Sequence, residues 1–112
     1  MKPEQVYIPK FNTHDLSRYG TMRNEVMDHI EKHGHHQISI ALGTLSEQEI
    51  RIYIQHIIQP LIYNMDTIKI HYHLIVSVGR LGENKMTVLR KELKKYFIQF
   101  RQDTRRQISI YG

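Results

Sequence analysis

The sequence predicts an α/β fold, a mixed sheet with about three helices in the order β-α-β-α-β-α-β. Stretches of strict apolar and polar alternation, typical of strands, take turns along the chain with stretches whose apolar residues recur every three or four positions, as in helices. The connections between successive strands are long enough to hold a helix, which favours parallel neighbours. An α+β arrangement is the alternative, because two strands are short and alternating rather than continuously apolar.

The best-marked strand covers residues 68–79, Ile-Lys-Ile-His-Tyr-His-Leu-Ile-Val-Ser-Val-Gly. Alternate residues place one apolar set on a single face, so we expect this to be the central strand against which the helices pack. At 12 residues it would be longer than the usual strand of about 5 to 6. Shorter stretches of the same pattern predict strands over residues 37–43 and 107–111.

The first part of the chain is less regular. Residues 6–8 form a short apolar run before a proline, which favours an edge strand or an extended lead-in over residues 1–12. A helix is predicted from Thr13, or from the asparagine before it, to Gly34. Gly20 interrupts this pattern, so it fits one helix with a weak point or two short helices.

The second helix has the clearest start. Ser46 and Glu49 have the spacing of a capping box, and Leu45 and Ile50 that of a hydrophobic staple. Pro60 is expected to kink or end the helix near its last turn. The predicted buried stripe comprises Ile50, Tyr53, Ile54, Ile57, Ile58 and Leu61.

A third helix is predicted from Asn84 onward, as the last helix of the chain. Its apolar positions step by three or four residues, which predicts a core stripe of Met86, Leu89, Leu93, Phe97 and Phe100. The opposite surface of this helix would carry Lys85, Arg90, Lys91, Lys94, Lys95 and Arg101.

Length and composition bound the class of protein. The 112 residues are 40% hydrophobic and 24% charged, as in a soluble globular protein, and predict one domain over residues 1–112. No apolar run approaches the roughly 20 residues of a membrane span, and no charged-then-apolar leader begins the chain, so no membrane partner is expected. Cysteine is absent, which excludes disulfides and thiolate metal sites. A cytoplasmic location is the resulting expectation.

The positive charge is concentrated at one end of the chain. Residues 1–84 hold eight Lys and Arg against nine Asp and Glu, a net charge of −1, whereas residues 85–112 hold eight against two, a net charge of +6. Such a segment attracts polyanions. We therefore expect a small basic nucleic-acid-binding accessory protein with a cationic C-terminal helix, whose contact residues are Lys91, Lys94, Lys95, Arg101, Arg105 and Arg106. Tyr96 and Tyr111 could stack on bases.

Other readings of the same surface stay open. The cations fit an acidic protein partner, as in an inhibitor or an assembly factor, and they also fit a solvated helix face without a ligand. Residues 107–111, as a short edge strand, could pair with a second copy of the chain and form a homodimer.

His71 and His73 form the most compact group with potential chemistry. Two imidazoles one residue apart on one strand face could ligate a single divalent metal, which would polarise a phosphodiester; otherwise no cofactor is expected. Without a metal, they are two polar side chains on the less buried face of a strand. Residues 32–36, Lys-His-Gly-His-His, form a second histidine cluster, whose metal could be shared with the first if the two strands are neighbours.

The segment His71-Tyr72-His73 locally resembles the HUH endonucleases of rolling-circle replication and transposition. In that family, metal-binding histidines lie on a central strand and a nucleophilic tyrosine lies on a later helix. The resemblance implies an alternative function as a metal-dependent single-strand nickase or nuclease, with His71 and His73 as ligands and Tyr96 as nucleophile. The chain departs from the family in leaving only 22 residues between His73 and Tyr96, without room for a further strand.

Overall fold

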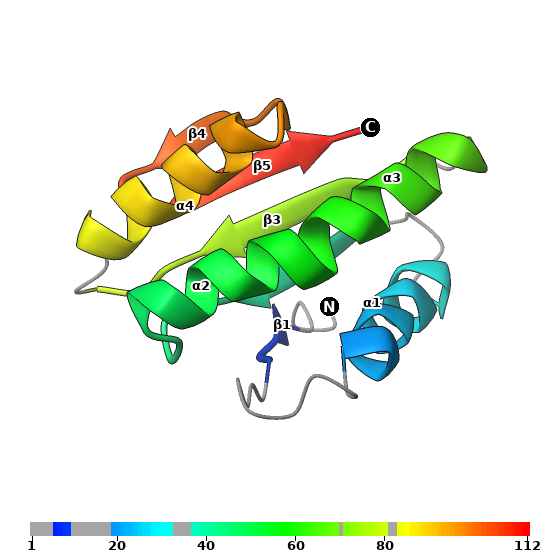
Figure 1. The fold of residues 1–112 in the computed structure, drawn as a ribbon, viewed down its shortest axis with the longest axis horizontal. Coiled ribbons are helices and arrows are strands. Elements are labelled where there is room, and N and C mark those ends of the chain that lie inside the picture. The colour runs from blue at the N-terminus through cyan, green and yellow to red at the C-terminus, as the bar shows by residue number, and fades with distance from the viewer. Residues whose placement is uncertain (1–5, 10–18, 33–36, 70, 81–82) are drawn as a thin grey trace, which may run out of the picture.

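The computed structural model describes residues 6–9, 19–32, 37–69, 71–80 and 83–112. One five-stranded mixed sheet runs through them in the order β1-β2-β3-β5-β4 (Figure 1). The strands are β1 (Val6–Tyr7), β2 (Gln37–Ala41), β3 (His73–Ser77), β4 (Arg101–Thr104) and β5 (Gln107–Tyr111). The helices are α1 (Tyr19–Lys32), α2 (Glu47–Tyr53), the π-helical segment η2 (Ile54–Ile58), α3 (Gln59–Thr67) and α4 (Glu83–Lys95). The α/β class is confirmed, with one strand more than the expected order.

The helices and the sheet form two layers. Strands β1, β2 and β3 are parallel neighbours, and β5 and β4 continue the sheet in antiparallel pairs. Both crossovers, from β1 to β2 and from β2 to β3, step in the same direction along the sheet. α1 packs against η2 and shares the same core cluster, so α1 and the α2–η2–α3 run lie on the same face. Figure 1 shows α2, α3 and α4 in front of that face, which leaves the opposite face of the sheet facing away from them.

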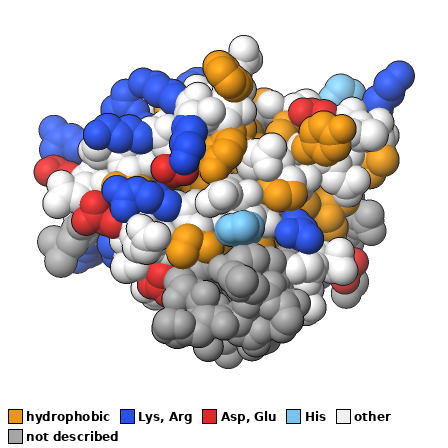
Figure 2. All heavy atoms as spheres, viewed as in Figure 1, with side chains coloured by type: hydrophobic (Ala, Val, Ile, Leu, Met, Phe, Trp, Pro, Cys, Tyr) orange, Lys and Arg blue, Asp and Glu red, His pale blue; other side chains and the backbone are white. Residues whose placement is uncertain are grey.

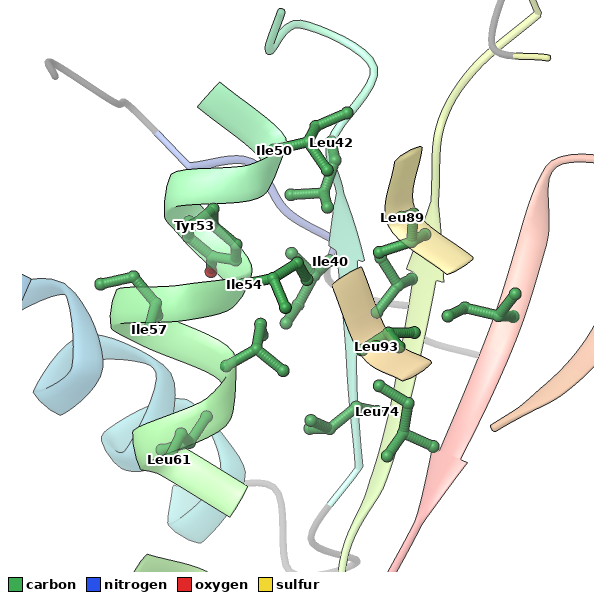
Figure 3. Close-up of a cluster of buried hydrophobic side chains, with 14 of the residues drawn as sticks. Ile40, Leu42, Ile50, Tyr53, Ile54, Ile57, Leu61, Leu74, Leu89 and Leu93 are labelled. Atoms are coloured by element: carbon green, nitrogen blue, oxygen red, sulfur yellow. The ribbon is translucent and has the colours of Figure 1, made fainter. Parts of the chain in front are cut away.

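The core lies between these two layers (Figure 3). On β2, β3 and β5 the residues that point toward the helices are at most 1% exposed: Ile38, Ile40, Leu74, Val76, Ile108 and Ile110. The predicted stripe of the second helix is buried in full against them, and Met86, Leu89 and Leu93 of α4 join the same cluster. Burying each such side chain contributes about 1.5 to 3 kcal/mol. The described residues thus share one hydrophobic core.

The capping box predicted for the second helix is present. Ser46 Oγ accepts a hydrogen bond from the Glu49 backbone N–H at 3.1 Å, and Glu49 Oε1 accepts from the Ser46 N–H at 2.9 Å. Leu45 and Ile50, the expected staple, are both buried. This end of the helix is therefore fixed by local sequence alone.

The sequence predicted that Pro60 would kink or end the second helix. It does not end the helix, because the helical run continues to Thr67. The proline follows the π-helical segment, and it has no N–H to donate to the His56 carbonyl four residues earlier. Arg23 of α1 donates Nη1–H to that carbonyl at 2.9 Å. A helix can contain a proline where side chains and a π-bulge satisfy the displaced backbone groups. The Arg23 hydrogen bond also connects α1 to this helix.

The central strand is shorter than predicted. β3 begins at His73, because the helix occupies the chain through Thr67 and Lys69 then turns it with a left-handed φ of 60°. Ile68, expected on the buried face, is 52% exposed. Tyr72 still pairs with Gly112, each residue donating its N–H to the carbonyl of the other, so the ladder extends one residue beyond the strand.

The last helix also ends earlier than predicted, at Lys95. Phe97 has a φ of 58°, its N–H bonds to the Lys94 carbonyl, and the Ile98 N–H bonds to the Leu93 carbonyl at 2.9 Å. These two bonds are those of a Schellman C-cap, which closes a helix and turns the chain. Phe97 is 93% exposed rather than in the core, and Arg101 lies on strand β4, which the sequence did not predict.

Two further expectations concern the first half of the chain and the sheet edge. Gly20 lies inside α1, whereas Thr13 and Gly34, the predicted ends of that helix, fall outside the described residues. β5 is paired on both sides, so residues 107–111 are not the free edge strand from which a homodimer was expected. Over the described residues, no helix combines the length and the apolar character needed to cross a bilayer.

Candidate nucleic-acid interface

The six predicted contact residues are all exposed, but they come from two elements. Lys91, Lys94 and Lys95 lie on α4, on the surface opposite its buried residues. Arg101 lies on β4, and Arg105 and Arg106 form the turn between β4 and β5. Figure 2 shows lysine and arginine side chains gathered over the region of α4 and β4. We call these six residues the basic surface; its second half is a hairpin, not the helix that the sequence predicted.

Little of this charge is neutralised locally. Arg101 Nε lies 3.1 Å from Asp103 Oδ1, and this is the one pair of a lysine or arginine with a carboxylate within 4.0 Å among the residues that the structure describes. Lys85, expected beside the other lysines, is half-buried and donates to the Gly43 carbonyl at 2.8 Å. The other five members of the basic surface are therefore available to an anionic ligand.

Asp103 organises the hairpin on the side of the sheet away from the helices. It is the extra residue of an irregularity in the β4–β5 register, between Gln102 and Thr104. Its carboxylate accepts from Ser109 Oγ–H and from Arg101. The Ser109 hydrogen bond, with help from Arg101 and Gln107, holds the pKa of Asp103 below its ordinary value.

His73 joins the same network from β3. Its Nε2 lies 3.1 Å from Ser109 Oγ, and its ring stacks on Tyr111 with 4.2 Å between centroids. Because the Ser109 hydroxyl donates to Asp103, it must accept from His73, which fixes the imidazole proton on Nε2. Burial lowers the pKa of His73, with a smaller contribution from Arg101, although Asp103 opposes the shift. The Ser109 hydroxyl is also buried, so this trio is not arranged as a nucleophile and its base.

The lowered pKa of His73 predicts a pH dependence of stability. The His73 imidazole binds a proton more tightly in the unfolded chain than in the folded protein. The stability that the neutral imidazole contributes is therefore fully present above the ordinary pKa of about 6.5 and is lost as the pH falls through the folded-state pKa. We expect the imidazole to titrate in NMR with a midpoint below 6.5. His73→Gln should then show a smaller loss of unfolding free energy between about pH 7 and pH 5. A midpoint above 6.5 would contradict the packing described here.

The structure gives the two histidines different surroundings. His71 precedes β3 and is exposed, with Nδ1 3.3 Å from the Gly112 carbonyl oxygen, whereas Nε2 of His73 is engaged by Ser109. Within the described ranges, no group of three or more His, Asp or Glu side chains could hold a metal ion. The second histidine cluster, residues 33–36, falls outside those ranges. Metal binding by His71 and His73 stays a prediction from sequence.

The structure does not bring Tyr96 together with His73. Tyr96 packs against the core on the helix side of the sheet, with Lys95 Nζ 5.5 Å above its ring. The His73 ring lies on the opposite side, beside Tyr111, whose hydroxyl accepts from Arg101 at 3.0 Å. Tyr96 and the His73 ring thus lie on opposite sides of the sheet, and the nickase alternative stays a prediction from sequence.

Sequence reasoning missed Asp103 and Ser109 and placed Phe97 in the core. No local pattern marks Asp103 and Ser109, because they meet only through the hairpin register, whereas Phe97 fits a helical stripe by spacing alone. No protein-family model, curated protein or solved structure matches this chain. The case for a function therefore rests on the residues and the geometry of this surface.

Proposed function

We propose that this protein is a small nucleic-acid-binding accessory protein whose contact surface is the basic surface. One observation carries the proposal: α4 and the β4–β5 hairpin each expose three of the six cations, and only Arg101 has a carboxylate partner among the described residues. Unpaired cations at this density release counterions from a phosphate backbone when they bind it.

A salt titration tests this proposal. Fluorescence anisotropy with labelled DNA and RNA should show binding at low salt that weakens as salt rises. If all six cations contact phosphates of a duplex, the slope of log K against log salt should be roughly −5. Absence of binding to any DNA or RNA at low salt would remove the proposal.

An acidic protein could bind the same cations, and a pull-down can distinguish such a partner from nucleic acid. Contacts bridged by nucleic acid are lost when a lysate is treated with nuclease before a pull-down, whereas direct contacts with an acidic protein survive. We expect the partners recovered with this protein to depend on nucleic acid, because an isolated surface ion pair with a carboxylate contributes little.

A further inference from the structure

A pocket opens beside the basic surface, on the helix side of the sheet. Its walls come from α3, the segment before β3, the link between α4 and β4, and the end of β5, and its volume is about 360 Å³. This is the low end of the range of about 300 to 1,000 Å³ that holds small molecules. The lining residues used in the following argument are Gln59, Tyr63, Asp66, Tyr96, Phe97 and Gln99. In Figure 2, hydrophobic side chains reach the surface to the right of the basic cluster, over the region between α4 and α3.

Phe97 is placed at this pocket at a cost to the fold. It holds the left-handed position of the Schellman cap, where glycine is usual because a side chain there is strained. Its ring is 93% exposed, so burial does not offset the strain. Tyr63, on the opposite wall, is also 70% exposed. Strained residues of this kind cluster at functional sites, and two exposed aromatic rings offer a ligand flat apolar surfaces.

The charges around the pocket indicate which part of a ligand enters it. Among the described residues that line it there is no lysine or arginine, and Asp66 is the one acidic residue, so the lining disfavours a phosphate. The cations lie at its edge instead, since Lys94 and Lys95 are exposed just before Tyr96, and Lys95 Nζ lies 5.5 Å above the Tyr96 ring. The Asp66 carboxylate, which accepts from the Tyr72 hydroxyl at 3.3 Å, and the amides of Gln59 and Gln99 line the pocket and can bond to the polar edge of a base.

We propose that this pocket holds an unpaired nucleobase, stacked on Phe97, while the basic surface binds the neighbouring phosphates. The inference rests on the proposed function and makes it more specific, because the ligand becomes single-stranded DNA or RNA. A paired base is stacked within its own duplex and cannot enter. Aromatic side chains beside a cationic track are the usual means by which proteins bind single strands.

The test compares single-stranded DNA, single-stranded RNA and a duplex of the same sequence, each of about 16 nucleotides, by fluorescence anisotropy. At least one single strand should bind about tenfold tighter than the duplex. The variant Phe97→Gly should lose about 5- to 100-fold in single-strand affinity and nothing in duplex affinity. Glycine suits the left-handed position, so this variant should melt at or above the temperature of the wild type.

Ile68→Gln is the matched control, since Ile68 is exposed but does not line the pocket; it should bind like the wild type. Equal affinities for single strand and duplex, or unchanged single-strand binding by Phe97→Gly, would overturn the base pocket and leave the basic surface standing. Failure of every nucleic acid to bind at low salt would remove both proposals.

Discussion

Replacing Lys91, Lys94 and Lys95 together by glutamine is expected to weaken nucleic-acid binding on the order of 10²-fold at about 0.1 M salt. Each lost phosphate contact also removes about 0.9 from the salt slope of a duplex, so the slope should become shallower by roughly 3. All three side chains are exposed on α4. Their replacement should change the free energy of unfolding by less than about 0.5 kcal/mol each, which denaturation in urea can check.

Two further variants show where the contact lies. Arg105→Gln with Arg106→Gln tests the hairpin turn and should reduce the slope by roughly 2 if both arginines contact phosphates. Lys69→Asn removes one charge far from α4 in the sequence, at a residue whose φ of 60° asparagine tolerates, and should leave binding nearly unchanged. Wild-type affinity in the triple variant would show that α4 is not a contact surface.

The parts of the fold that could be predicted follow local rules. The capping box at Ser46 needs only two residues three positions apart, and the buried stripe after it needs only helical spacing. The alternating strands were found for the same reason, since β2 and β3 both alternate between half-buried and buried residues. The surplus of cations was likewise visible in composition.

The errors arise where distant residues override a local signal. Pro60 predicts a kink or an end of the helix, but the helix continues, because the π-helical segment precedes the proline and Arg23 of α1 donates to the His56 carbonyl. Phe97 continues the apolar spacing of α4, yet a cap that normally calls for glycine ends the helix there. The pocket and the network around Asp103 depend on how β5 pairs with β3 and β4, which one sequence does not reveal.

A large effect on stability is expected at Leu93. Its side chain is fully buried in the core, and its carbonyl accepts the Ile98 N–H that closes the Schellman cap. Leu93→Ala leaves a cavity without disturbing the backbone and should cost about 2 to 5 kcal/mol, measured by urea denaturation. Lys94→Ala, on the exposed side of the same turn, should cost less than about 0.5 kcal/mol.

The same pair of variants separates the two roles of α4. Leu93 does not face the ligand. Folded Leu93→Ala should therefore keep nucleic-acid affinity within about twofold of the wild type, because a buried substitution that does not move the surface leaves the ligand contacts unchanged. Lys94→Ala should show the reverse, with intact stability and weaker binding. A cost below about 1 kcal/mol for Leu93→Ala would mean that α4 is not held by the core. The core would then not fix the position of the α4 lysines or of the pocket beside them, since both depend on where α4 ends.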